Sequence, residues 1–75
     1  MKDKENIQKK FGKHLKKLRQ EMNVTMSELS RRTFIEKPHI SRLEKGESNP
    51  TLFTLHKIAD ALKISIEELF KGYRP

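Results

Sequence analysis

The stretch that decides the fold is TMSELSRRTFIEKPHISRLEKGESNPT, residues 25–51. Thr25 followed three residues later by Glu28 matches the capping box, in which each side chain accepts a hydrogen bond from an amide at the start of a helix. This pattern predicts a helix over about 26–33. A helix of that length is not stable alone in water, so it must pack against its neighbours.

A second short helix is predicted from about 37 to 44. Glu36 is an acceptor that can cap the amide three residues later, and Pro38 suits the first turn, where its missing amide proton has no partner. The connection is so short that the two helices must cross sharply, and the small Ser30 leaves room for Ile40 at the crossing. Such a pair is a helix-turn-helix.

The core positions of this pair are Leu29, Ser30, Ile35, Ile40 and Leu43, and the segment ISRLEKGESNPT, residues 40–51, adds Glu44, Gly46 and Pro50. In these features the chain resembles the lambda-repressor-like family, the phage repressor and Cro group of bacterial DNA-binding proteins, from about residue 11 to residue 70. The resemblance implies a compact all-α bundle of five helices in which helices 2 and 3 form the helix-turn-helix. The chain also resembles compact phage repressors and the controller proteins of restriction systems.

The chain departs from the family at Phe34. Relatives usually carry glycine there because this turn residue tends to have a positive φ, which a bulky side chain adopts only with strain. We expect either a positive φ held by packing of the Phe34 ring, or a turn reshaped to avoid the strain.

Length and composition restrict the class of protein. Seventy-five residues make one domain, near the lower limit for a single core. The absence of cysteine excludes disulfides and thiolate metal sites and suits a reducing cytosol. No apolar run approaches the length of a membrane span, and the basic start is not followed by an apolar signal core. We expect a cytoplasmic protein, associated with the bacterial nucleoid, that binds no membrane and no small-molecule ligand.

The sequence contains no pattern typical of an enzyme or a metal site. His14, His39 and His56 do not form a pair at a metal-binding spacing such as HExxH. There is no set of Ser, His and Asp placed by a known motif and no glycine-rich phosphate loop. We therefore expect no catalytic activity, no metal and no cofactor.

The net charge of +7 is unevenly distributed. Residues 1–20 carry eight basic and two acidic side chains, a net of +6, whereas residues 21–75 carry nine basic and eight acidic ones, a net of +1. Such a basic segment attracts polyanions. A solvated lysine surface that aids solubility is the other interpretation, and both stay open.

The remaining helices follow from apolar spacing. Ile7, Phe11, Leu15, Leu18 and Met22 recur at spacings of four, four, three and four, which predicts a helix over about 7–22. Gly12 is an unfavourable interior residue there, at a cost of up to ~1 kcal/mol. Residues 1–6 are expected to be a flexible basic tail, residues 7–72 the domain, and residues 73–75 a loose end.

Helix 4 is expected to start after Thr51 and to bury Leu52, Leu55, Ile58, Ala59 and Leu62. Helix 5 is expected to be short, opened by a capping box at Ser65 and Glu68 and closed by Gly72.

The resemblance assigns base contacts to the outer side of helix 3, whose N-terminal part lies in the major groove in this family. Ile40 and Leu43 face inward, so the outer side carries Lys37, Pro38, Ser41 and Arg42. Arg42 is the strongest candidate because a guanidinium can donate two hydrogen bonds to guanine. Met26 stands where many relatives place a glutamine, and it either touches a thymine methyl or packs against the protein.

Phosphate contacts are expected where helix N-termini offer free amides. The resemblance places one such site at Thr25 to Ser27 and others around the loop and the start of helix 4, at Lys45, Ser48, Asn49 and Thr54. For Lys45 and Asn49 the alternative is an ordinary loop residue.

Arg19 and Glu44 are interpreted as structural. Each lies at the edge of an apolar stripe, and partly buried charges need partners. In relatives these two positions form an ion pair that ties helix 1 to helix 3, and the resemblance carries this pairing over.

The implied function is that of a transcriptional regulator, a repressor or autoregulator, that binds double-stranded DNA as a homodimer on a palindromic operator. We place the dimer interface around the loop before helix 4, Phe53, Phe70 and Tyr73, although Phe53 can also be an ordinary exposed aromatic. The alternative function is a protein-interaction or RNA-associated adaptor with the same fold. Donor-bearing side chains on helix 3 favour DNA.

Overall fold

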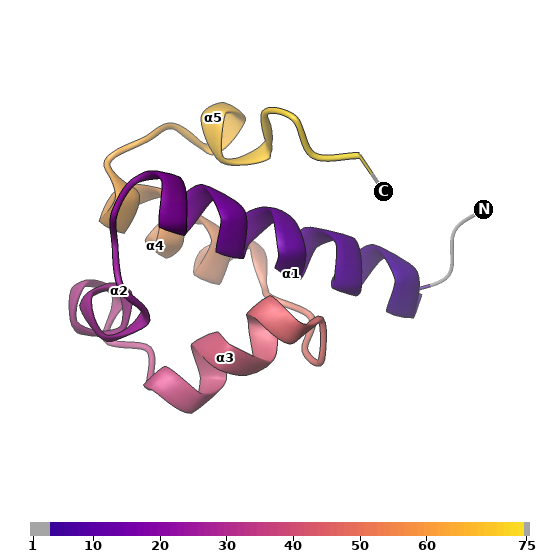
Figure 1. The fold of residues 1–75 in the computed structure, drawn as a ribbon, viewed down its shortest axis with the longest axis horizontal. Helices are drawn as coiled ribbons and strands as arrows, with labels where there is room; N and C mark the ends of the chain where they lie inside the picture. The colour runs from indigo at the N-terminus through magenta and orange to yellow at the C-terminus, as the bar shows by residue number, and fades with distance from the viewer. Residues whose placement is uncertain (1–3, 75) are drawn as a thin grey trace.

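The computed structural model describes residues 4–74. Within them lie five α-helices and no strand: α1 (Lys4–Glu21), α2 (Met26–Thr33), α3 (Lys37–Lys45), α4 (Leu52–Leu62) and α5 (Ile66–Phe70) (Figure 1). The predicted all-α, five-helix architecture is confirmed. The first helix starts three residues earlier than predicted, so residues 4–6 of the predicted flexible tail are helical, and residues 1–3 lie outside the described residues.

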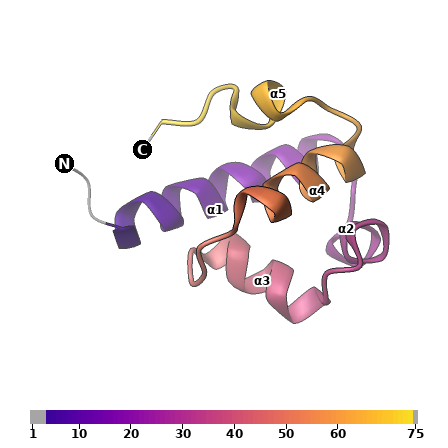
Figure 2. The same cartoon turned by 180° about the vertical axis from the view of Figure 1, so that it is seen from behind.

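The helices wrap around a core to which each contributes. In Figure 1, α1 crosses the molecule with α5 and the C-terminal segment on one side and α3 on the other, and Figure 2 shows the same order from behind, with α4 in front of α1. One side chain from each helix is completely buried: Leu15, Leu29, Ile40, Ile58 and Leu69. The apolar stripes predicted from spacing therefore meet in one core.

Three apolar residues at helix ends lie outside that core. Ile7 is 39% and Met22 36% exposed, because they stand near the two ends of α1 beyond the helices packed against it. The expectation that Leu52 is buried is wrong, since this first residue of α4 is 68% exposed. Helical spacing predicts which side of a helix a residue lies on. Burial also requires that another part of the chain pack against the helix at that position along its axis.

Capping explains most helix starts. The reciprocal box at Ser65 and Glu68 is formed, with the Glu68 amide donating to Ser65 Oγ at 3.0 Å and the Ser65 amide donating to Glu68 Oε1 at 2.9 Å. The hydrogen bond from the Ser65 amide, followed by that from the Ser65 side chain, lowers the pKa of the Glu68 carboxyl group. Thr51 likewise accepts a hydrogen bond from the Thr54 amide.

The other two predicted caps differ from expectation. Thr25 accepts the Glu28 amide at 3.0 Å, but the Glu28 carboxylate is bound by Arg31 and Arg32 on the same helix, so the box is only half formed. The pKa of Glu28 is lowered by the hydrogen bond from Arg32 and then by that from Arg31. Glu36 precedes α3, yet its side chain caps none of the described amides.

Two predictions about the C-terminus are also corrected. α5 ends at Phe70, and the residue at its C-cap is Lys71 rather than Gly72. Tyr73 is not loose: its ring lies 5.8 Å from that of Phe11, and its hydroxyl donates to the Ile7 carbonyl at 3.4 Å. Aromatic packing therefore holds the chain against α1 as far as Tyr73, and Pro75 lies outside the described residues.

Gly12 sets the distance between α1 and the end of α3. A Cβ at this position would lie 2.5 Å from the Glu44 carbonyl oxygen and 2.6 Å from that of Leu43. Gly46, the residue that caps α3, lies against the backbone of α1, because a Cβ there would be 2.5 Å from Lys9 Cα. Its φ of +77° also favours glycine. The two glycines let the helices cross with their backbones in contact.

Candidate nucleic-acid interface

The turn between α2 and α3 is fixed by side chains on α2. Ser30 Oγ donates to the Ile35 carbonyl at 2.6 Å, and Thr33 Oγ1 donates to the Leu29 carbonyl at 2.8 Å while accepting the Ile35 amide at 3.2 Å. The bonds of Ser30 and of the Ile35 amide connect the end of α2 to the residues before α3, and the bond from Thr33 to Leu29, within α2, fixes the Thr33 hydroxyl for this contact. The angle between the two helices is therefore held by hydrogen bonds as well as by packing.

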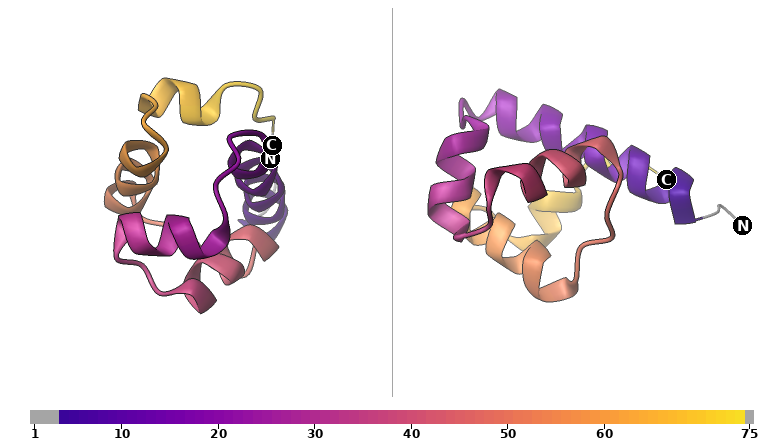
Figure 3. Two further views of the ribbon diagram at one scale, coloured as in Figure 1. Left: turned by 60° about the vertical axis from the view of Figure 1, so that its left-hand side comes forward. Right: turned by 90° about the horizontal axis from the view of Figure 1, so that it is seen from below.

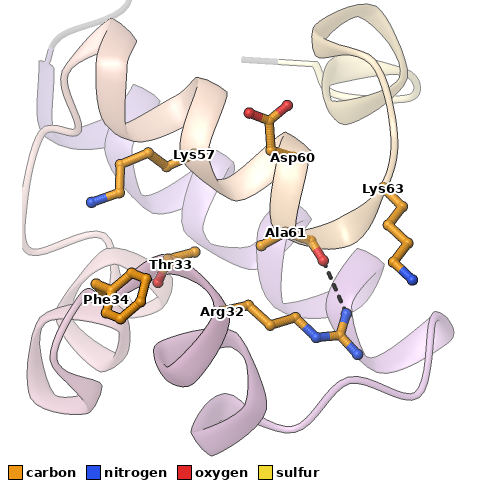
Figure 4. Close-up of a pocket in the computed structure, with 7 residues that line it drawn as sticks. All are labelled: Arg32, Thr33, Phe34, Lys57, Asp60, Ala61 and Lys63. Carbon is orange, nitrogen blue, oxygen red and sulfur yellow. Dashed lines mark hydrogen bonds between the residues drawn. The ribbon is translucent and has the colours of Figure 1, made fainter.

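Phe34 has a φ of +60°, as one of the two expected turns requires. The expectation that its ring is held by packing is wrong, because the residue is 92% exposed. Figure 4 shows the ring at the edge of a shallow hollow of about 390 Å³, whose wall includes Thr33 and, from α4, Lys57 and Asp60. The positive φ is stabilised instead by the Phe34 amide, which donates to the Ser30 carbonyl at 2.9 Å.

Arg19 joins the first helix to the helix-turn-helix. Its Nε donates to Glu44 Oε2 at 2.6 Å, its Nη2 to Glu44 Oε1 at 3.0 Å, and its Nη1 to the Val24 carbonyl at 2.8 Å. Both residues are buried, with exposures of 7% and 6%. The hydrogen bond to Glu44 raises the pKa of Arg19, so the guanidinium stays charged. It fixes the C-terminal turn of α3 relative to α1 and the start of α2.

The outer face of α3 carries the predicted base-contacting side chains. Lys37, Pro38 and Arg42 are exposed and Ser41 is half-buried, while Ile40 and Leu43 are buried on the opposite side. His39 is also exposed, next to Pro38. The face therefore presents hydrogen-bond donors of the kind that contact base edges.

The start of α2 lies on the same side of the molecule as α3 (Figure 3, right). Thr25 Oγ1 caps the Glu28 amide, and Thr25 and Ser27 are both exposed. Met26 is half-buried and packs against the core, which corresponds to one of its two expected positions. The Met26 and Ser27 amides of the first helical turn remain available to an anion.

The remaining predicted phosphate contacts lie in the loop after α3 and at the start of α4. Lys45 and Asn49 are exposed, and Thr54 is half-buried at the start of α4 with its amide bound to Thr51. The hydroxyl oxygen of Ser48 is buried without a hydrogen-bond partner among the described residues, so it has to change rotamer to reach a phosphate.

The three residues expected at a dimer interface do not lie in equivalent surroundings. Phe53 is 73% exposed beside the exposed Leu52, with Lys57 Nζ 5.4 Å from its ring centroid. Phe70 and Tyr73 instead pack within the chain, 5.4 and 5.8 Å from the Phe11 ring, and keep only part of their surface exposed. Leu52, which the helical pattern placed inside, adds to the exposed apolar surface at the start of α4.

Residues 4–74 contain no group of three His, Cys, Asp or Glu side chains arranged to hold a metal ion. No helix among them is both long and apolar enough to cross a membrane.

Comparison with known proteins agrees with this geometry. Residues 15–69 match the helix-turn-helix family model HTH_3. The chain belongs to the helix-turn-helix family of DNA-binding transcriptional regulators. This membership also makes it a regulator rather than an enzyme.

Two relatives and one solved structure span most of the chain. It is 36% identical over 64 residues to the uncharacterised HTH-type transcriptional regulator y4dJ of Sinorhizobium fredii, covering 85% of this chain and 83% of the relative. It is 36% identical over 70 residues to the control protein C.MunI of a Mycoplasma species, covering 87% and 89%. The crystal structure of the restriction-modification controller protein C.AhdI from Aeromonas hydrophila superposes with a TM-score of 0.78 and 31% identity, covering 83% and 94%. Other regulators that match are more than twice as long as the matched segment.

Proposed function

We propose that this helix-turn-helix protein binds a specific operator by inserting α3 into the major groove, with residues 37–42 toward the bases. The observation that carries the proposal is the outer face of α3, where Lys37, Ser41 and Arg42 offer donors on a helix whose opposite side is locked into the core. Arg42 contacts a guanine through O6 and N7, and the other side chains contact neighbouring base edges or phosphates.

The backbone contacts come from two places around α3. The free amides at the start of α2, next to Thr25 and Ser27, hold one phosphate, and the loop and start of α4 hold others through Lys45, Asn49 and Thr54. These contacts fix the position of the protein on the duplex without selecting a sequence. Met26 packs at the edge of this surface and can touch a thymine methyl.

The protein acts as a homodimer on an inverted repeat. One helix contacts too few base pairs to single out a site in a genome, because each pair contributes only about 1 to 3 kcal/mol of discrimination. Two-fold symmetry places the half-sites about 10 base pairs apart, centre to centre. Exposed Leu52 and Phe53 supply the contact nearest to the proposed DNA surface.

A second part of the dimer surface lies between the loop before α4 and the end of α5. A hollow of about 190 Å³, lined by Pro50, Phe70 and Tyr73 among others, continues the apolar surface there. Bound over a promoter in the nucleoid, such a dimer represses transcription, including that of its own gene.

The test compares a base contact with a phosphate contact. Arg42→Ala should cost about 1 to 3 kcal/mol on the specific site and relax the preference at one base pair, whereas Lys45→Ala should weaken specific and random duplexes equally and reduce the salt slope by about 0.9. Fluorescence anisotropy with both duplexes at several salt concentrations measures these effects. If Arg42→Ala weakened both duplexes equally, α3 would not read bases through Arg42.

A further inference from the structure

One exposed face of α1 is strongly basic. Lys10, Lys13 and Lys17 follow one another at intervals of three and four residues, which places them on one face of the helix. All three are exposed, and none forms an ion pair with a carboxylate of residues 6–74. Together with Arg74 from the C-terminal segment they line an open hollow of about 390 Å³. We call these four residues the basic ridge.

The basic ridge extends away from the proposed operator surface. Figures 1 and 2 place α1 between α3 on one side and α5 with the C-terminal segment on the other. Lys17 lies toward the C-terminal segment that carries Arg74, where Gly72 and Tyr73 also line the hollow. Lys10 and Lys13 also border a hollow toward Lys45, so the ridge begins near the end of α3 and runs to the far side of α1.

The chemistry of the basic ridge suits a duplex backbone. Residues 10–17 span about 10 Å at the rise of an α-helix, and along that length a DNA duplex presents about six phosphate charges. Tyr73, the tyrosine beside the ridge, is half-buried with its ring against Phe11 and Phe70, so it is engaged within the fold and less suited to stacking on the bases of a single strand. The apolar side of α1 is buried in the core and cannot enter a membrane.

We infer that the basic ridge binds the phosphate backbone of a second DNA duplex while α3 occupies the groove of the first, so that the bound protein bridges two DNA segments. The inference rests on the proposed function for the first duplex only. Binding of the second duplex uses none of the side chains assigned to base contacts, and it has no sequence preference because phosphates carry no sequence information.

The test is a capture assay with the full chain. Beads carrying an operator duplex, obtained by selection from random sequences, are saturated with protein, washed and mixed with a labelled duplex of unrelated sequence. The parent protein should retain the labelled duplex. Lys13→Gln/Lys17→Gln should reduce capture at least tenfold and lower its log–log salt slope by about 1.8, since each lost phosphate contact removes about 0.9. Operator affinity should change less than twofold.

The matched control is Arg31→Gln/Lys63→Gln, which removes the same charge from exposed residues outside the basic ridge and should keep the capture of the parent. Equal loss in both variants would show a general charge effect, and unchanged capture in the ridge variant would show that the ridge holds nothing; either overturns the inference. So does a matching fall in operator affinity, because the ridge would then contact the first duplex. A failure of the proposed function looks different, since the beads would carry no protein at all.

Discussion

Gly12 is where α1 comes closest to the end of α3, and Gly12→Ala tests how the recognition helix is positioned. In an ordinary helix interior alanine is more favourable than glycine by about 1 kcal/mol. Here the new methyl group would lie 2.5 and 2.6 Å from two backbone oxygens of α3, which no side-chain rotation can relieve. Overpacking of this kind typically costs about 1 to 3 kcal/mol, and contacts this short belong at the upper end.

The expected net result is therefore a loss of about 1 to 2 kcal/mol, equivalent to a fall in Tm of about 5 to 15 °C for a domain of this size. Urea and thermal unfolding followed by circular dichroism measure both. Lys16→Gly and Lys16→Ala, at an exposed position of the same helix, provide the intrinsic difference between glycine and alanine in α1. If Gly12→Ala stabilised the protein by that same difference, α1 and α3 would not be in backbone contact and the reasoning would be refuted.

Three further predictions concern stability and pH. Glu44→Ala should lower the free energy of unfolding by about 3 to 5 kcal/mol in urea, because it leaves Arg19 buried without its partner. The double variant Arg19→Met/Glu44→Leu should cost less than Glu44→Ala alone. Strictly additive losses would mean that the two side chains are not coupled. Phe34→Gly should stabilise the domain by up to ~1 kcal/mol. The left-handed conformation costs a non-glycine residue about 1 to 2 kcal/mol, and removing the exposed ring sacrifices little buried surface. A loss near the ~3 to 5 kcal/mol of a core truncation would show a packed ring. Glu68 has a lowered pKa in the folded state, so its contribution to stability is present above the pKa of the unfolded state and is lost as pH falls through the pKa of the folded state. Ser65→Ala should raise the pKa of Glu68 part of the way to its ordinary value, as measured by NMR titration. An unchanged pKa would contradict the capping box.

Local patterns predicted the helix starts where the side chain suits the geometry of a cap. Thr51 and Ser65 carry a hydroxyl one carbon from the backbone, and both cap the amide three residues later. Glu36 has a longer side chain that is not among the preferred caps, and the His39 amide bonds to the Glu36 carbonyl instead. The predicted starts of α2, α4 and α5 agree with the structure for this reason.

Features that depend on distant residues were not predictable in the same way. Local sequence identifies Gly12 only as an unfavourable residue inside a helix. Its role in the close packing of α1 on α3 depends on the carbonyl oxygens of residues 43 and 44. Tyr73 carries no local signal for packing on Phe11, which precedes it by more than sixty residues. The pairing of Arg19 with Glu44 came from family resemblance, because charge patterning alone does not select one partner among many.

The outward side chains of α3 followed from helical spacing once Ile40 and Leu43 were assigned to the core. The exposure of Phe34 did not, because spacing within a helix says nothing about a residue in the turn that follows it.

Selection of bound sequences from random duplex DNA tests the central claim most directly. A dimer that inserts two copies of α3 into successive major grooves should enrich an inverted repeat with half-sites about 10 base pairs apart, and Arg42→Ala should lose the preference at one symmetric pair of positions. Enrichment of a single half-site, or of no motif at all, would contradict sequence-specific binding by a homodimer.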